Sequence, residues 1–185
     1  MNDQERCSLC NEELSRYGNK QLADGIMCRN CAKLVSPWYT DDDLKEMTVE
    51  ALRDHLEYRK QNEEKVAAFK ESRKVDGKYS LYIDDEDGLF MLSKRKDLQK
   101  DNPDVLALGD IEEIEVSEER YQDTGVDIYL KMKLNGGQIR HLKMRVNEFP
   151  GIARESDEYQ NDSKLALAYL DALANEDFEE VKEDR

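Results

Sequence analysis

All four cysteines of the chain lie near its N-terminus as two Cys-x-x-Cys pairs, Cys7/Cys10 and Cys28/Cys31, with seventeen residues between the pairs. Each pair closes a tight turn that directs two thiolates to one point, so two such turns can form a tetrahedral four-sulfur cage. The pattern predicts one structural zinc ion, because four sulfur ligands leave no coordination position for water or substrate. Iron, bound as in rubredoxin, is the alternative metal, since the same thiolates accept it.

Two redox disulfides or four unrelated thiols would also account for the cysteines. The first ten residues, MNDQERCSLC, contain no apolar signal-peptide segment, and no apolar run approaches the ~20 residues that span a bilayer. We therefore expect a soluble, cytoplasmic protein with no membrane partner. Stable disulfides are rare in that compartment, which favours the metal.

The net charge of the chain is -15, from 28 basic and 43 acidic residues. Such an excess argues against direct binding to DNA, RNA or an anionic membrane, which requires basic surface. Residues 1–36 carry five acids and five bases, so the excess lies downstream, and it is densest in the C-terminal segment DALANEDFEEVKEDR. We interpret that segment as a helix end followed by a solvated acidic tail. The expected partner is neutral or basic.

Changes in sequence pattern divide the chain into three parts and predict an α+β fold. Residues 1–36 are predicted to form a zinc-ribbon module, in which YGNKQLADGIM is a hairpin between the two cysteine pairs. Residues 37–76 form a helical linker. Residues 77–185 form an antiparallel sheet domain that is closed by a C-terminal helix and followed by the acidic tail.

The linker contains two threonines, Thr40 and Thr48, at positions typical of helix N-caps, with acids following each. From Thr48 the segment TVEALRDHLEYRKQNEEKVAAFKESRKV predicts one long amphipathic helix. Its apolar face comprises Val49, Leu52, Leu56, Val66 and Phe69. Such a helix is typical of an element that packs against its neighbours. It can also connect the zinc-ribbon module, called the head below, to the sheet domain, called the body.

Beyond Gly77 the apolar residues alternate as they do in strands. KYSLYI and LFML flank a turn, Asp84–Gly88, whose four acids lack the EF-hand spacing, so we expect a solvated turn rather than a calcium site. Three further strands follow in IEEIEV, VDIYLKMKLN and QIRHLKMRVN, and Asn135-Gly136-Gly137 joins the last two. The closing helix is predicted in NDSKLALAYLDALANEDF, with one apolar face formed by Leu165, Tyr169, Leu170 and Leu173.

The last hairpin separates its faces. Its apolar residues, Val126, Ile128, Leu130, Met132, Leu134, Leu142, Met144 and Val146, should line the core. Its opposite face is basic and comprises Lys131, Lys133, His141, Lys143 and Arg145. That face is either a contact surface or a solvated face whose cations pair with acids of neighbouring strands.

Several segments together carry a family resemblance. LADGIMCRNCAKLVSPWY, with the upstream Cys-x-x-Cys and the downstream EEKVAAFKESRKV, resembles a bacterial family of unknown function. DGKYSLYIDDEDGLFML and NPDVLALGDIEEIEV are similar to the body of that family. The resemblance implies an N-terminal four-cysteine zinc ribbon, a helical linker and a pleckstrin-homology-like body in a bacterial host cell. It implies metal ligands at Cys7, Cys10, Cys28 and Cys31 and assigns no catalytic residue.

We expect no enzymatic activity. The two histidines, His55 and His141, neighbour no cysteine, serine elbow or acid pair in a recognisable arrangement. Gly136-Gly137 is a turn rather than a phosphate loop, because no helix follows it.

Two binding functions remain. The first is an acidic inhibitor of a basic nucleic-acid-handling protein, since small acidic phage proteins that inhibit type II CRISPR nucleases resemble this chain in size and charge, and at least one also contains a metal-bound cysteine module. Such an anti-CRISPR protein would hinder the loading of target DNA. The second is a cellular adaptor that recruits a host protein, and direct DNA binding by the ribbon is disfavoured. The acids expected to contact a partner form three clusters: Asp41, Asp42 and Asp43; Asp84, Asp85, Glu86 and Asp87; and Glu112, Glu113, Glu115, Glu118 and Glu119.

Overall fold

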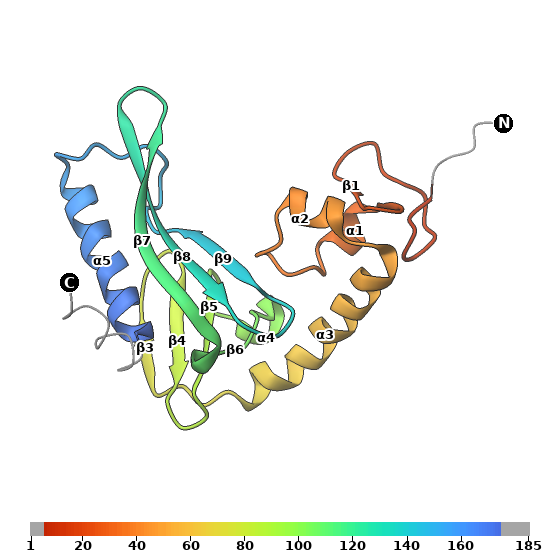
Figure 1. Ribbon diagram of the computed structural model, residues 1–185, viewed down its shortest axis with the longest axis horizontal. Coiled ribbons are helices and arrows are strands. Elements are labelled where there is room, and N and C mark those ends of the chain that lie inside the picture. The colour runs from red at the N-terminus through yellow and green to blue at the C-terminus, as the bar shows by residue number, and fades with distance from the viewer. Residues whose placement is uncertain (1–5, 175–185) are drawn as a thin grey trace. The chain divides into compact units, whose positions relative to one another are not determined.

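A computed structural model describes residues 6–174 of the chain (Figure 1). Contacts within the chain divide it into two compact units, with the boundary between Ala67 and Ala68. The three parts expected from the sequence, 1–36, 37–76 and 77–185, remain a prediction. The acidic tail that follows Ala174 lies outside the described residues.

The N-terminal unit begins with a small hairpin and continues into helices. Strands β1 (Lys20–Gln21) and β2 (Ile26–Met27) pair antiparallel, which confirms the hairpin predicted between the cysteine pairs. The helices are α1 (Arg29–Ala32), α2 (Asp41–Glu46) and α3 (Val49–Ala68). The short α1 was not predicted, because its four residues belong to the second cysteine turn.

Both predicted threonine caps are present. Thr40 forms a capping box with Asp43, in which the Thr40 hydroxyl oxygen accepts from the Asp43 amide and the Asp43 carboxylate accepts from the Thr40 amide. The Thr48 hydroxyl oxygen accepts from the amide of Ala51 at 3.1 Å. These side chains satisfy amides that have no partner within their helices, so the positions at which α2 and α3 begin are encoded locally.

The helix α3 is shorter than predicted. It ends at Ala68, and Arg73–Val75 form strand β3 instead of a further helical turn. The backbone between them is bound by the next strand, since the amide of Lys70 donates to the Asp84 carboxylate and the amide of Ser72 donates to the Ile83 carbonyl. Strand pairing therefore outweighs the helical propensity of this charged segment.

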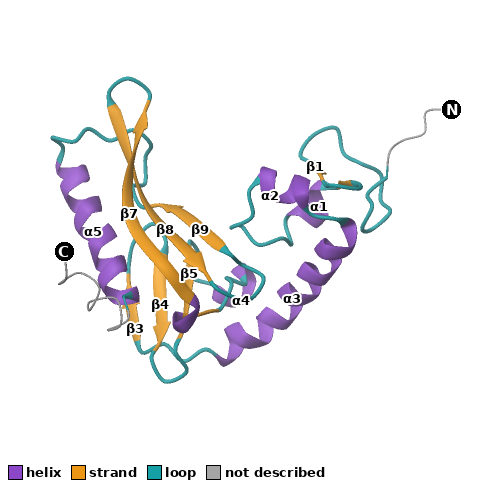
Figure 2. Ribbon diagram, in the orientation of Figure 1, coloured by secondary structure: helices purple, strands orange, loops and turns teal. Residues whose placement is uncertain are grey.

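The C-terminal unit contains two antiparallel sheets (Figure 2). The first has the order β3-β4-β5-β6, with β4 (Ser80–Asp84), β5 (Leu89–Ser93) and β6 (Leu106–Ala107). The second has the order β7-β8-β9, with β7 (Ile111–Tyr121), β8 (Gly125–Leu134) and β9 (His141–Arg145). The strands predicted around the Asp84–Gly88 turn and in the last hairpin are present. The sequence did not predict β3, β6, the short α4 (Leu98–Asp101) or the 3-10 turn Leu108–Asp110.

The core of this unit follows the predicted alternation. The apolar residues predicted to face inward on β8 and β9, and Val146 after them, are all buried. The basic side chains between them lie on the opposite face, where they are half-buried or exposed. Because consecutive strand residues point to opposite faces, the sequence alone was sufficient to separate core from surface here.

The closing helix α5 (Asp157–Leu173) begins earlier than predicted, at the N-cap Ser156. It contacts β7, β8 and β3, and it buries Ala166, Tyr169 and Leu173, whereas Leu165 and Leu170 are only half-buried. The Tyr169 hydroxyl donates a hydrogen bond to the backbone carbonyl of Tyr79, and a Cβ at Gly77 would overlap that hydroxyl. The predicted α+β fold is confirmed: a four-cysteine head, a long helix, antiparallel sheets and a C-terminal helix.

No helix among residues 6–174 combines the length and the apolar character that crossing a membrane requires.

Candidate metal centre

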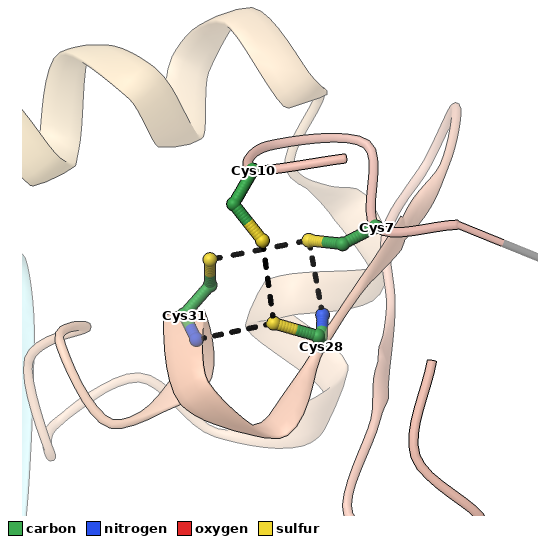
Figure 3. Close-up of side chains that lie close together, drawn as sticks. All are labelled: Cys7, Cys10, Cys28 and Cys31. Carbon is green, nitrogen blue, oxygen red and sulfur yellow. Dashed lines mark hydrogen bonds between the residues drawn. The ribbon is translucent and has the colours of Figure 1, made fainter. Parts of the chain in front are cut away.

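The four cysteines converge on one point, as the sequence predicts (Figure 3). Their sulfur atoms all lie within 4.8 Å of one another; the Sγ atoms of Cys7 and Cys31 are 3.9 Å apart, and those of Cys10 and Cys28 are 3.7 Å apart. A tetrahedral zinc ion with Zn–S bonds of about 2.3 Å requires sulfur atoms about 3.8 Å apart. The cluster therefore has the size of a cage around one structural metal ion.

Backbone amides surround the sulfur atoms. The amides of Leu9 and Cys28 donate to Cys7 Sγ at 3.4 and 3.2 Å, and the amide of Cys31 donates to Cys28 Sγ at 3.4 Å. The last contact also caps α1, since Cys28 is its N-cap residue. These amide contacts orient the sulfur atoms and hold each cysteine turn in place.

Three of the thiols, those of Cys7, Cys10 and Cys31, differ in their affinity for protons. Burial raises the pKa of Cys7, but the amides of Cys10, Cys28 and Leu9 together outweigh burial and lower this pKa to about 6. Burial, followed by the neighbouring thiols, raises the pKa of Cys31. The Glu12 amide and the Cys31 thiol lower the pKa of Cys10, yet desolvation and the thiols of Cys7 and Cys28 leave it raised overall. One thiolate thus opposes the ionisation of its neighbours, and a bound cation is what would allow all four to ionise.

The cage is part of the core of the N-terminal unit. Cys7, Cys28 and Cys31 are buried together with the apolar side chains of Leu22, Met27, Val35, Leu44 and Leu52, whereas Cys10 is exposed. Residues of the hairpin, of α2 and of the start of α3 therefore share one small core with the sulfur atoms. Three of the four ligands are shielded from water, as in a structural metal site.

Polar contacts hold the hairpin against the start of α3. The Asp24 carboxylate accepts from the amide of Val49 at 2.7 Å, and the Arg53 guanidinium donates to the carbonyl of Ser8 at 3.2 Å. Gly25 allows this approach, because a Cβ there would overlap the side chains of Ser8 and Val49. The first turns of α3 thus belong to the unit that contains the four cysteines.

His55 is a structural residue that the sequence did not reveal. Its side chain is fully buried, and its Nε2 accepts from the amide of Ser36 at 3.1 Å. The ring packs against Tyr39 in an edge-on contact with centroids 4.7 Å apart, and it also lies beside Tyr58. The position of His55, one turn after Leu52 on the apolar face of α3, was the available signal.

The first acidic cluster caps α2. Asp43 completes the capping box, Asp41 pairs with Lys20 at 2.7 Å, and Asp42 pairs with Lys45 at 2.9 Å. The hydrogen bond from Lys20 lowers the pKa of Asp41. These acids therefore stabilise the start of a helix within the N-terminal unit.

The second cluster organises the β4–β5 turn. Asp84 is buried and accepts from the amides of Lys70 and Asp87, both at 3.1 Å. Asp85 accepts from the Arg73 guanidinium through two hydrogen bonds of 2.8 and 2.7 Å and also contacts Ser72, and these contacts lower its pKa to about 2. Glu86 approaches Lys70 at 3.5 Å. Most of this turn is thus engaged within the protein.

The third cluster neutralises the basic sheet face. Glu112 and Glu113 on β7 pair with Lys133, and Glu119 pairs with both Lys131 and Lys143, at distances from 2.7 to 3.8 Å. These contacts correspond to the second interpretation of that face, a surface whose cations pair across strands. Glu118 lies on the other face, where it contacts Arg154 and the hydroxyl of Tyr159.

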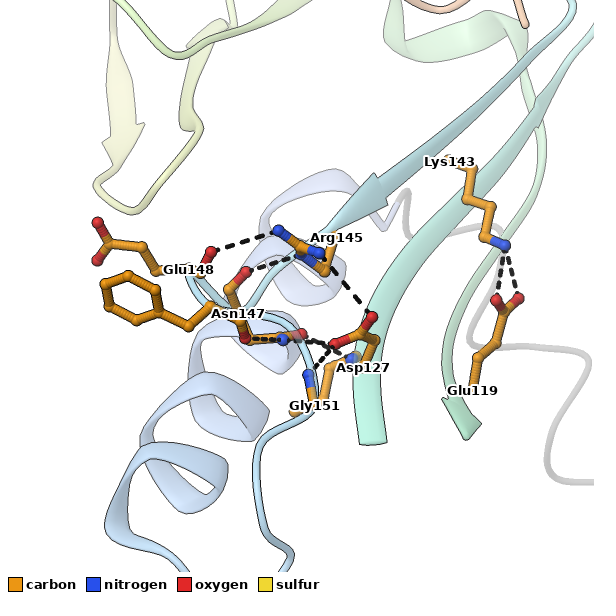
Figure 4. A network of polar contacts seen from close by, with 9 residues as sticks. Glu119, Asp127, Lys143, Arg145, Asn147, Glu148 and Gly151 are labelled. Carbon is orange, nitrogen blue, oxygen red and sulfur yellow. Dashed lines mark hydrogen bonds and ion pairs between the residues drawn. The ribbon is translucent and has the colours of Figure 1, made fainter. Parts of the chain in front are cut away.

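A buried polar network beside this face was not predicted from the sequence (Figure 4). Asp127, only 4% exposed, accepts from the Asn147 side chain at 2.9 Å and the Gly151 amide at 2.8 Å, and Arg145 lies 3.9 Å away. Asn147 in turn accepts from the Ile128 amide and donates to the Phe149 carbonyl. The network fixes the loop after β9 against β8. An aspartate between Val126 and Ile128 in a strand was its signal.

Comparison with known proteins gives a match in the N-terminal part of the chain only. Residues 5–55 match the model of a family described as a domain of unknown function, DUF4428. No curated protein and no solved structure matches the chain. The matched segment contains all four cysteines, the hairpin, α2 and the start of α3, and these are the elements that build the small core around the sulfur atoms.

Proposed function

We propose that the protein is a non-enzymatic protein-binding module whose head is held in shape by one structural Zn²⁺. The observation that carries this proposal is the four-thiol cage, in which the metal would bind four sulfur atoms and have no position for a substrate. A bound Zn²⁺ would supply cross-linking of the two cysteine turns. The chain's own residues position the thiolates through the amides of Leu9, Cys28 and Cys31.

The role of His55 supports a binding function over catalysis. Its Nε2 is occupied by the Ser36 amide, and two tyrosines flank the ring, so its contacts account for its presence on structural grounds. A general acid or base requires a reactive nitrogen within reach of a substrate.

The charge of -15 supports a basic partner. In a narrower form of the proposal, the partner is an RNA-guided type II nuclease, and the protein hinders its loading with target DNA. Internal contacts reduce the number of acidic side chains that are available to such a partner. Asp43, Asp84 and Glu119 are engaged internally, whereas in the part of the chain that the structure describes no cation pairs with Asp87 or Glu115.

A gel-shift assay of guide-loaded type II nuclease on labelled target DNA tests this form. Increasing amounts of the zinc-loaded protein should reduce the shift, and the double variant Asp87→Asn/Glu115→Gln should weaken the effect. A matched control, Glu63→Gln/Glu64→Gln, removes the same charge from exposed positions of α3 outside the three clusters. Unchanged shifts with several nucleases would overturn the inhibitor.

The alternative is a cellular adaptor that recruits a host protein through the head or the sheet body. The DUF4428 match favours this reading, because it concerns the four-cysteine N-terminal region and includes only one of the three acidic clusters, Asp41 to Asp43. A pull-down from bacterial lysate with the zinc-loaded protein separates the two. Salt-resistant capture of one host protein that is lost in Cys28→Ser would support the adaptor, while a complex that dissociates as salt rises would support charge-driven inhibition.

A further inference from the structure

One end of the β3–β6 sheet gathers cations on this acidic protein. The register pairs Ser80 with Ser93, so the residues before β4 lie beside those after β5. Lys78 thereby neighbours the sequence Lys94-Arg95-Lys96, and the Lys94 ammonium lies 4.8 Å from the centre of the Tyr79 ring. We call Lys78, Lys94 and Lys96 the cationic end.

The cationic end differs from the basic face of the β7–β9 sheet, where acids of β7 neutralise Lys131, Lys133 and Lys143. Within residues 6–174 no carboxylate lies within ion-pair distance of Lys78, Lys94 or Lys96, while the intervening Arg95 pairs with Asp101. Burial and the nearby cations Arg145 and Lys94 lower the pKa of Lys78, although Glu148 and Asp127 partly offset them. Cations that repel one another in this way favour an anionic ligand.

An exposed aromatic side chain lies in the adjoining loop. Arg145, whose charge acts on Lys78, donates a hydrogen bond to the carbonyl of Glu148, and Phe149 follows directly. The Phe149 side chain is 73% exposed, whereas its backbone is fixed, because the Asn147 side chain donates a hydrogen bond of 2.7 Å to the Phe149 carbonyl. A single exposed apolar side chain is common on protein surfaces, so Phe149 matters here because its loop adjoins the cations through Arg145.

The chain itself carries a segment of matching chemistry. Residues 176–184, EDFEEVKED, contain six acids, one lysine and a phenylalanine, Phe178, between the acids. They lie outside the described residues and follow α5 directly. Tyr169 of α5 already contacts the Tyr79 carbonyl beside Lys78, and Ala174 is only five residues further on, about 7.5 Å along a helix axis.

We propose that the acidic segment 176–184 docks on the cationic end, with its carboxylates against Lys78, Lys94 and Lys96 and Phe178 against Phe149. Eleven residues beyond Ala174 reach up to about 36 Å when extended, so the length of the chain does not limit the contact. Exposed ion pairs are individually weak, but a segment tethered in the same chain acts at an effective concentration on the order of millimolar. A nucleic acid or an anionic membrane would instead meet the repulsion of the whole chain.

Lysine acetylation of the zinc-loaded full chain, mapped by mass spectrometry, tests this docking. In the wild type at low salt, Lys78, Lys94 and Lys96 should react about fivefold more slowly than in Glu176→Gln/Asp177→Asn/Glu179→Gln/Glu180→Gln, and high salt should abolish the difference. The control Glu50→Gln/Asp54→Asn/Glu63→Gln/Glu64→Gln removes the same four charges from α3 and should react as the wild type does. Lys100 and Lys164 are internal references.

Amide NMR spectra provide the second readout. Lys78→Gln/Lys94→Gln/Lys96→Gln should shift the amide signals of residues 176–180, and Phe178→Ala should shift that of Phe149. Equal acetylation rates in the wild type and the tail variant, with no reciprocal shifts, would overturn the proposal. Protection of the three lysines by inorganic phosphate or by phosphatidylglycerol vesicles, with no effect of the tail variant, would also overturn it and assign the surface to a phosphate-bearing ligand.

Discussion

The two units of this protein build their cores from different materials. In the N-terminal unit three cysteines are buried among short runs of apolar residues drawn from a hairpin and parts of two helices. In the C-terminal unit most buried residues are apolar side chains of the two sheets and α5, together with a few hydrogen-bonded polar residues such as Asp127 and Asn147. A small unit buries too little apolar surface to be stable by itself, so a metal ion can take the place of the missing core. The body should need no metal.

The largest expected effect tests that difference directly. Cys28→Ser should abolish stoichiometric zinc binding and unfold the head, since structural zinc in small domains contributes on the order of 10 kcal/mol. Metal analysis and amide NMR spectra should show loss of zinc together with loss of the dispersed signals of residues 6–67, while signals of 68–174 persist. Lys33→Ser, an exposed change beside the second cysteine turn, is the control and should keep the metal. A folded, metal-free head in Cys28→Ser would refute the comparison.

Asp127→Ala should have the largest effect on the body. The change leaves the Asn147 side chain and the Gly151 amide without their shared acceptor in a buried site and removes the ion-pair partner of Arg145. We expect it to destabilise the unit by about 3 kcal/mol. Urea unfolding followed by signals of the body measures the loss, and zinc content should remain unchanged. Asp123→Ala, in the exposed β7–β8 turn, is the matched control. Equal stability of the two variants would show that the network does not hold the loop.

His55→Ala should affect the head alone and less severely. It removes the acceptor of the Ser36 amide and leaves a cavity beside Tyr39, at an expected loss of about 2 kcal/mol. The rate at which a chelator removes zinc should therefore rise. His141→Ala, an exposed position on β9, should not change that rate. If both variants release zinc as slowly as the wild type, His55 does not support the metal-containing core.

The smallest effect concerns an exposed ion pair of the body. The Arg73 guanidinium and the Ser72 hydroxyl lower the pKa of Asp85 to about 2. Because the folded-state pKa lies below the unfolded value of about 3.9, the pair stabilises the fold above pH ~4, and this stabilisation is lost as the pH falls towards 2. An NMR titration of the Asp85 carboxyl should give this low pKa, and Arg73→Ala should raise it towards 3.9. The control is Lys74→Ala, because the Lys74 ammonium pairs with Asp76; this change should leave the pKa of Asp85 unchanged. An Asp85 pKa near 3.9 in the wild type would show that Arg73 does not bind the Asp85 carboxylate.

Local features of the sequence were sufficient to predict much of the fold. The spacing of the cysteines predicted the cage, Thr40 and Thr48 marked the helix starts, and the alternation from Val126 to Val146 separated the core of β8 and β9 from the surface. Each of these depends on geometry that repeats within a few residues, so the residues themselves encode it. The end of α3 was predicted wrongly, because Arg73–Val75 find their hydrogen-bond partners in β4 and not in the preceding turn.

The sequence by itself thus determined the four-cysteine cluster, the fold class and the inward faces of the strands. Only the tertiary structure decided which charges are available to a partner. Asp84 is buried and accepts from the amides of Lys70 and Asp87, and Glu119 is engaged by two lysines from other strands. Lys78 lies beside the strand end that carries Lys94, and no carboxylate of the described residues lies within ion-pair distance of either lysine. In sequence these residues look alike, since each is a charged side chain in a charged segment. Their pairing depends on strand register and on contacts between residues far apart in the chain, which no local pattern contains.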